Sequence, residues 1–346
     1  MPDKITRYFI RLIFSECLNP DNSEMRKLMK KHHLNPHLIL LAAILIIAAI
    51  SVIRLIIWNR GTKSDYDPEH LAEGFDIEAL DTIIPLSDSL LEGHEDDGVT
   101  TILCLGNNVL TDETGEKSFT ALLSAKTGAT VYNGGFPEST IGAHYSSYNE
   151  GYPKDNFNLP YVAESICTKD FSRLESAAAA EQSPVYQEAT ETLKNIDYGK
   201  IDMIAIVYDA ADYLALIPSD NPNDPHELST YTGGLRNAIE DIQETYPYIR
   251  IVVMSHTFAH AIDENGNYQN GGSTDLGNGA LPHYLLKEVD VSISCGISII
   301  DNFYGTVNED NYSDYMTDYI HLNDAGRELM AERLAELVNT GHTSKR

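Results

Sequence analysis

Apolar residues follow two different patterns along the chain. Near the N-terminus, residues 38–53 are apolar apart from Ser51, and residues 55–58 extend the run. Beyond residue 99, short apolar runs alternate with stretches in which apolar residues recur every three or four positions. Short runs of this kind are typical of buried strands, and the wider spacing is typical of helices with one buried face. We therefore predict an apolar N-terminal helix followed by a domain of alternating strands and helices.

The second pattern predicts the elements of that domain. Strands are expected at residues 100–105, 129–132, 201–208, 249–254 and 291–300. Helices are expected at residues 118–126, 161–195 (in several pieces), 233–246 and 324–339, with a short lead-in helix or two over 76–92. Asn265-Gly266 is a candidate hairpin turn. Strands separated by helices indicate an α/β fold, a three-layer sandwich with a mostly parallel sheet.

The apolar N-terminal run is long enough to cross a lipid bilayer. It reaches about 20 residues, the length that a transmembrane helix needs. A buried core helix is the alternative, but basic residues precede the run and a polar stretch follows it. Because Lys and Arg are denser before the run, the positive-inside rule places the N-terminus in the cytoplasm. We predict a single-pass protein of the cell membrane: a basic cytoplasmic segment (1–36), a transmembrane helix (37–58), a linker with the lead-in helix (59–98) and an extracytoplasmic domain (99–346).

Charge and cysteine content exclude several classes of partner. The chain has 24 Lys and Arg against 52 Asp and Glu, a formal net charge of -28. Such a chain lacks the cationic surface that nucleic acids require, so we expect no nucleic-acid partner. The four cysteines fit neither a zinc pattern nor a disulfide framework. His256 and His260 have metal-ligand spacing, but His256 follows a strand, so we expect no metal and no cofactor.

Polar residues follow the predicted strands at the positions where ligands gather in parallel sheets. Asp318 and His321 precede the last predicted helix, three residues apart. At that spacing the carboxylate can hold the imidazole Nδ1–H, which leaves Nε2 free to accept a proton. The residues after the earlier strands are Asn107, Asn108, Gly134, Gly135, Asp209, Ala211, Asp212 and His256.

Four blocks of the sequence carry a family resemblance. Residues 102–108 read Ile-Leu-Cys-Leu-Gly-Asn-Asn, residues 131–135 read Val-Tyr-Asn-Gly-Gly, residues 208–212 read Tyr-Asp-Ala-Ala-Asp, and Asp318 to Gly326 contain Asp-x-x-His-Leu-Asn. In this order they resemble the blocks of the SGNH hydrolases, also called GDSL esterases, over about residues 100–339. The resemblance implies a flavodoxin-like fold of the SGNH-hydrolase type and the hydrolysis or transfer of acyl esters, often on carbohydrate.

The resemblance also assigns roles, and two of the assigned positions lack the required group. His321 would be the base, Asp318 its orienting carboxylate, and Gly135 an oxyanion N–H donor. Asn108 stands where the family has its nucleophilic Ser, and an amide cannot replace that hydroxyl. Ala211 stands where the family has an oxyanion Asn, and its side chain donates nothing.

Three hypotheses follow. In the favoured one, the domain is catalytically impaired and binds a cell-envelope ligand such as a carbohydrate in the old ester cleft, lined by Asn107, Asn108, Asp209, Asp212, His256 and His321. In the second, it is an active acyl-ester hydrolase or deacetylase that uses water activated by His321 or a relocated nucleophile, for which the candidates are Thr111, Ser139, Thr140 and Ser255. In the third, it is a non-catalytic module that assists an envelope enzyme. The expected partners are the membrane and either a cell-surface carbohydrate or an envelope protein.

Overall fold

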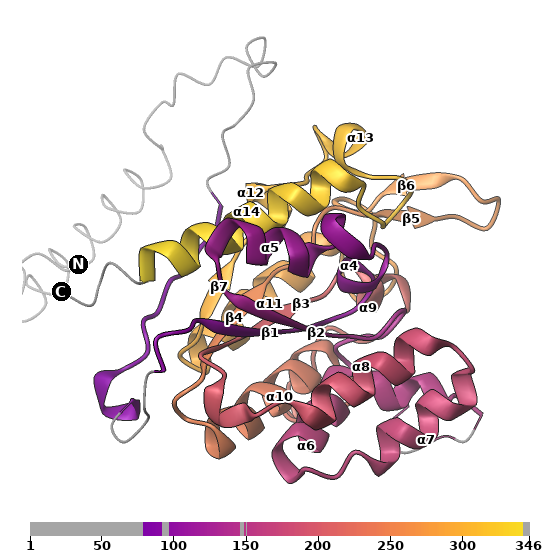
Figure 1. Ribbon diagram of the computed structural model, residues 1–346. Coiled ribbons are helices and arrows are strands. Elements are labelled where there is room, and N and C mark those ends of the chain that lie inside the picture. The colour runs from indigo at the N-terminus through magenta and orange to yellow at the C-terminus, as the bar shows by residue number, and fades with distance from the viewer. Residues whose placement is uncertain (1–78, 92–96, 146–148, 150, 342–346) are drawn as a thin grey trace, which may run out of the picture. The chain divides into compact units, whose positions relative to one another are not determined.

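The computed structural model describes residues 79–91, 97–145, 149 and 151–341 (Figure 1). These residues belong to one compact unit that spans Asp76–Arg346. The predicted cytoplasmic segment (1–36) and transmembrane helix (37–58) lie outside the described residues. Within the described ranges, no helix combines the length and the apolar character that a membrane span needs.

A parallel sheet forms the middle layer. Its five strands are β1 (Thr101–Gly106), β2 (Thr130–Gly135), β3 (Met203–Val207), β4 (Arg250–Met254) and β7 (Ser298–Ile300), in the spatial order β2-β1-β3-β4-β7. Every neighbouring pair is parallel. This is the strand order of flavodoxin-like folds, in which ligands bind where the order reverses, next to β1 and β3. The predicted α/β fold with a mostly parallel sheet is therefore confirmed.

Helices cover both faces of the sheet. In Figure 1, α5 (Phe119–Thr127) and α14 (Asp324–Gly341) lie on one side, and α6 (Leu159–Thr168), α8 (Pro184–Asn195) and α10 (Tyr231–Thr245) lie on the other. Two more helices are α7 (Ser172–Glu181) and α11 (Leu281–Ser294), and the latter packs against α10. Short helices follow the strands or precede α14: α4 (Asn108–Thr111), α9 (Ala211–Leu214), α12 (Asn302–Gly305) and α13 (Tyr312–Tyr315). The helices predicted at 118–126, 161–195, 233–246 and 324–339 are confirmed.

Local sequence signals explain where α5 begins and ends. The Ser118 hydroxyl accepts a hydrogen bond from the Ala121 N–H at 3.3 Å, which satisfies one free donor of the first turn. Gly128 ends the helix with φ +72°, a left-handed conformation that favours glycine. The two ends of α5, and therefore the place where the chain turns toward β2, are thus determined by residues next to them in the sequence.

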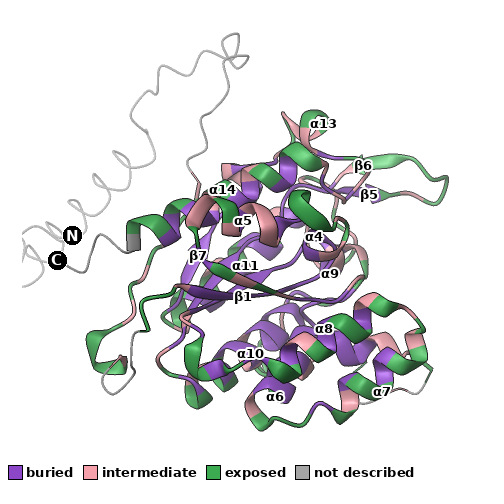
Figure 2. Cartoon of the chain, viewed as in Figure 1, coloured by how far each residue is buried: buried purple, intermediate pink, exposed green. Residues whose placement is uncertain are grey.

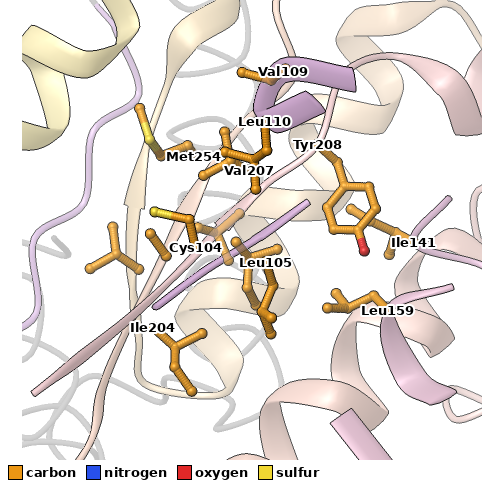
Figure 3. Packing of buried hydrophobic residues seen from close by; sticks show 14 of the residues in the cluster. Cys104, Leu105, Val109, Leu110, Ile141, Leu159, Ile204, Val207, Tyr208 and Met254 are labelled. Atoms are coloured by element: carbon orange, nitrogen blue, oxygen red, sulfur yellow. The ribbon is translucent and has the colours of Figure 1, made fainter. Parts of the chain in front are cut away.

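The sheet and its covering helices enclose one apolar core (Figure 3). All six residues of β1 and all five of β3 are buried, as expected for the central strands of a sheet covered on both faces. Cys104 lies on β1 in this core, and burial raises the pKa of its thiol to about 12. Figure 2 shows that the outer faces of the helices are exposed, so their apolar residues face the sheet.

The last strand lies within the run of residues 291–300, as predicted, but it takes up only the end of that run. The first four of these residues complete α11, and the strand β7 holds only Ser298–Ile300. Gly296, with φ +70°, forms the turn between the two elements. Residues 291–300 form one apolar run because the last turn of α11 lies just before the buried strand β7. The length of an apolar run does not show where a helix ends and a strand begins.

The lead-in helix predicted over 76–92 is not found in the described part of that segment, apart from a short 3-10 turn at Asp88–Leu90. Thr82 instead forms an antiparallel bridge with Ile299, with two backbone hydrogen bonds of 2.9 Å. The Ser298 hydroxyl bonds both the N–H and the carbonyl oxygen of Ile84, each at 3.0 Å. The segment is extended because it satisfies the edge of β7, which would otherwise present unpaired backbone groups.

The hairpin predicted at Asn265-Gly266 is confirmed. Strands β5 (His260–Ile262) and β6 (Tyr268–Asn270) pair antiparallel, and Gly266 takes φ +80° in the turn. The Asp263 carboxylate accepts hydrogen bonds from the N–H groups of Asn265 and Asn267, both at 2.8 Å. The hairpin projects beside α13, on the side where α4 and α9 follow the sheet strands (Figure 1).

Candidate functional site

The loop that enters α14 brings Asp318 and His321 together. His321 Nδ1 lies 2.8 Å from Asp318 Oδ2. The other carboxylate oxygen accepts the N–H groups of Ile320 at 2.9 Å and of His321 at 2.8 Å. The loop is closed by a bridge between Met316 and Leu322. The carboxylate is thus fixed by its own loop, and it orients the imidazole.

The surroundings of His321 raise the pKa of its imidazole. Burial lowers its pKa, but the hydrogen bond that its Nδ1–H donates to Asp318 and the charges of Asp112, Asp318 and Asp209 outweigh that effect, so the pKa lies above the usual 6.5. Burial acts on Asp318 as well, yet the two loop N–H groups and His321 hold its pKa below the ordinary range. Within the described part of the chain, the hydrogen bond of the imidazole is the one between Nδ1 and Asp318, and no hydroxyl is bonded to Nε2.

Asn107, Asn108 and Asp209 form a buried cluster at the ends of β1 and β3. Asp209 accepts the Asn107 amide at 2.7 Å on one oxygen and the Asn108 amide at 2.8 Å on the other. The Asp209 N–H in turn donates to Asn107 Oδ1 at 3.0 Å. Burial raises the pKa of Asp209, and the two amides oppose the rise. We refer to these three residues as the Asn–Asp cluster.

Both ends of the Asn108 amide are engaged. Its Nδ2 donates to Asp209, and its Oδ1 accepts the Glu138 N–H at 2.9 Å. Only 8% of Asn108 is exposed. The side chain at the nucleophile position therefore ties three loops together, those following β1, β2 and β3.

The two positions assigned to an oxyanion hole are also occupied within the fold. The Gly135 N–H donates to Asn133 Oδ1 at 2.9 Å. A Cβ on Gly135 would lie 2.6 Å from Leu110 Cβ, so only glycine fits there. The Ala211 N–H donates to Asp209 Oδ1 at 2.9 Å, and its side chain is a methyl group. In this arrangement neither residue presents a free donor.

Asp212 and His256, which the sequence placed in the cleft, are buried inside the domain. The Asp212 carboxylate accepts the N–H groups of Ile141 at 2.9 Å and Gly142 at 2.7 Å. Burial raises its pKa to about 7. His256 Nδ1 lies 3.5 Å from the buried Glu288 Oε2 on α11. Of the six residues expected to line the cleft, only His321 lines the hollow described below, and the residues of the Asn–Asp cluster, Asp212 and His256 do not.

The four hydroxyls considered as relocated nucleophiles bond to backbone oxygens. Ser139 donates to Phe136 at 2.8 Å, Thr140 to Gly142 at 2.7 Å and Ser255 to His256 at 3.2 Å. Thr111 donates to Asn107 at 3.3 Å. These hydroxyls lie on three separate segments, and none of them bonds to His321.

An open hollow of about 690 Å³ lies beside His321. It is lined by Asp112, Glu113, Thr317, Asp318, His321, Leu322, Asn323, Asp324, Ala325 and Arg327. Sequence reasoning missed Asp112, Glu113 and Arg327. Asp112 directly follows α4, with its N–H on the Asn108 carbonyl at 2.8 Å, so its place one helical turn after Asn108 was an available signal. Within the described residues, no group of His, Cys, Asp and Glu is arranged to hold a metal ion.

Comparisons with known proteins inform the fold. No protein-family model matches the chain, and no curated protein matches it in sequence. One solved structure is 17% identical, covers 72% of this chain and 99% of its own, and gives a TM-score of 0.50. A possible lipase from Chitinophaga pinensis is 13% identical over 69% of this chain and 98% of its own, with a TM-score of 0.46. A carbohydrate acetylesterase from Sinorhizobium meliloti is 11% identical over 70% of this chain and 99% of its own, with a TM-score of 0.41.

Likeness at these identities concerns the fold alone. The topology adds to it, since the strand order is flavodoxin-like and the four sequence blocks lie at the ends of β1, β2 and β3 and at the start of α14. The order of the sequence blocks agrees with this arrangement of the elements, and the described part of the chain is an α/β domain with a flavodoxin-like strand order.

Proposed function

We propose that the protein is a membrane-anchored, extracytoplasmic SGNH-type protein that does not hydrolyse esters and binds a cell-envelope carbohydrate in the cleft beside His321. The observation that carries this proposal is the engagement of Asn108 at both ends of its amide. A hydroxyl that His321 can deprotonate is required for acyl transfer of this type. The four alternative hydroxyls bond to backbone oxygens, so none of them is in place as a partner for His321.

Ester hydrolysis tests the proposal directly. The full-length chain, purified in mild detergent, is expected to hydrolyse a chromogenic acetate ester no faster than its His321→Ala variant. Removing the nucleophile of a serine hydrolase costs a factor of about 10⁶ in rate, so a silent domain is readily distinguished from an active one. Turnover that disappears with His321→Ala would show that the domain is an enzyme.

A second function, hydrolysis by activated water, is favoured by one observation. Asp318 holds His321 Nδ1, and Nε2 carries no hydrogen bond to a described hydroxyl while the residue lines the open hollow. A base placed in this way can take a proton from water. The same assay separates the two functions, because this mechanism predicts turnover that needs His321 and Asp318 but is indifferent to Ser139→Ala.

The carbohydrate part of the proposal rests on the character of the hollow. Carboxylate, amide and guanidinium groups line it, and these groups suit the hydroxyls of a sugar. Ala325 is exposed and lines the hollow, so Ala325→Trp is expected to fill it and abolish oligosaccharide binding in titration calorimetry. Binding that survives this substitution would place the ligand elsewhere.

The membrane anchor is proposed from the sequence. Residues 37–58 carry the apolar run, and the more basic segment precedes it. The protein is expected to stay with the membrane fraction after alkaline carbonate extraction, and a chain without residues 37–58 is expected to be released. Release of the full-length chain by carbonate would contradict the proposed transmembrane anchor.

A further inference from the structure

A pair of tyrosines stands next to the cleft, and we call Tyr268 and Tyr319 the aromatic platform. Tyr268 begins β6 and is 54% exposed. Tyr319 lies in the loop that carries Asp318 and His321. The two tyrosine rings have centroids 6.0 Å apart, and the Tyr319 ring lies 6.3 Å from the imidazole of His321. The platform therefore extends from the base toward the β5–β6 hairpin.

The platform is supported from within the fold. His260, on β5, stacks on Tyr268 with a centroid distance of 5.4 Å and an interplanar angle of 17°. Its backbone N–H bonds the Tyr319 carbonyl at 2.8 Å, which joins the hairpin to the His321 loop. Phe258 and Tyr312 close around the same imidazole at 4.9 and 4.5 Å. His260 is only 8% exposed, and neither of its ring nitrogens has a hydrogen-bond partner. Its role here is to hold the Tyr268 ring in place.

Tyr319 also lies close to the groups of the cleft. Burial raises the pKa of its phenol, and Asp318, Asp209, Tyr268 and Glu138 add to the rise in that order. The ring thus lies within electrostatic range of the Asn–Asp cluster and of Tyr268 on the hairpin. A ligand held at His321 would meet the platform when it extends toward the hairpin.

The charge around the hollow restricts the ligand. Four carboxyl groups line it, Asp112, Glu113, Asp318 and Asp324, against the cation Arg327 and the imidazole of His321. The chain as a whole has a formal net charge of -28. Anionic polymers are repelled by such a surface. Uncharged sugars are not repelled, and they present both hydroxyls for carboxylates and an apolar C–H face for aromatic rings.

We infer that the aromatic platform stacks one sugar ring of an uncharged oligosaccharide while a neighbouring unit occupies the hollow beside His321. This inference rests on the proposed carbohydrate binding and extends it to a second contact outside the old ester cleft. Exposed aromatic rings that are rigidly backed bind with little loss of side-chain entropy. Tyr268 meets both conditions, because His260 stacks on its ring while more than half of the residue stays exposed.

Titration calorimetry with three hexasaccharides tests this inference on the full-length chain in detergent. The probes are chitohexaose and cellohexaose, which are uncharged, and hexagalacturonate, which is anionic. The protein is expected to bind at least one of the uncharged probes and not the anionic one. Tyr268→Ala is expected to weaken binding about tenfold, since one aromatic contact contributes roughly that factor. Tyr268→Phe, which keeps the ring, should bind as the unmodified protein does.

Two control variants separate the inference from the proposal beneath it. Tyr132→Ala removes an exposed tyrosine on edge strand β2 that does not line the hollow, and it should leave binding unchanged. Binding that Ala325→Trp abolishes and Tyr268→Ala leaves intact would overturn the aromatic platform alone. Failure of the unmodified protein to bind either uncharged probe would overturn the carbohydrate proposal, and the platform with it. Preference for hexagalacturonate would contradict the charge argument.

Discussion

Asn108 has a structural role at the carboxyl end of the sheet. Its amide joins Asp209, after β3, to the backbone of Glu138, after β2, while the residue itself follows β1. Hydrogen bonds to a charged carboxylate are stronger than those between neutral groups, by roughly a factor of two. A serine at this position would be too short to make both contacts. The Asn108 amide therefore holds together the loops that follow β1, β2 and β3.

At the same scale, the pKa of His321 depends on Asp318. Replacing Asp318 by Asn removes the charge and weakens the bond to Nδ1, so the His321 pKa should fall, because burial lowers it and only the carboxylates raise it. An NMR titration of the imidazole in the full-length protein measures this change. Asp314→Asn, which alters an exposed carboxylate on α13, serves as the matched control. An unchanged His321 pKa in Asp318→Asn would show that the pair seen here does not govern the imidazole.

At the scale of elements, the edge of the sheet depends on a segment far away in sequence. Thr82 pairs with Ile299, and Ser298 bonds both backbone groups of Ile84. The short strand β7 is thereby covered on its outer side. A three-residue strand with unpaired backbone groups along its edge would contribute little stability to the sheet. Residues 79–86 satisfy those groups and therefore act as part of the sheet.

Ser298→Ala tests that arrangement. The substitution removes three hydrogen bonds, two with the Ile84 backbone and one from the Arg250 guanidinium at 3.4 Å, and it leaves the Ile84 N–H without its partner. The free energy of unfolding should therefore fall by about 1–3 kcal/mol. Denaturant unfolding followed by circular dichroism gives the value. Ser89→Ala, whose hydroxyl bonds only the exposed Ser87, is expected to change little. Equal stabilities of the two variants would mean that the segment adds nothing to the sheet.

For the whole molecule, buried carboxyl groups make stability depend on pH. Burial raises the pKa of Asp212 to about 7 and also raises those of Asp209 and Glu288. In the unfolded chain such groups lose their protons near pH 4. Between these values the folded state binds more protons than the unfolded state, so stability must fall as pH rises through this window.

The melting temperature is accordingly expected to fall between about pH 5 and pH 7.5, and more steeply in the unmodified protein than in Asp212→Asn. The variant loses one titrating group and therefore part of the slope, whatever it does to absolute stability. Asp310→Asn changes the net charge equally at an exposed position and should keep the slope. Identical slopes for Asp212→Asn and Asp310→Asn would refute the link to the buried carboxyl.

Much of the fold could be predicted from the sequence because its signals are local. Apolar runs in the sequence predict the buried strands β1, β3 and β4. The capping residues Ser118 and Gly128 mark where α5 begins and ends. The predicted secondary structure was wrong where tertiary contacts or neighbouring elements outweighed the local apolar pattern. Residues 291–294 are the last turn of α11, and the apolar strand β7 begins only a few residues later. Thr82 is extended because it pairs with Ile299 of β7.

In the site, the Asp318–His321 pair was predictable because three residues of one loop suffice to make it. The Asn–Asp cluster was not predictable, because it joins positions about a hundred residues apart in the sequence. The burial of Asp212 and His256 inside the domain was not predictable either. By itself the sequence determined the α/β alternation, the four blocks and the presence of Asn at position 108, which are properties of residue identity and short spacing. Tertiary structure alone decided which amides meet which carboxylate and that Tyr268 stands next to Tyr319, because such contacts arise only when the sheet and its hairpin bring distant segments within a few ångströms.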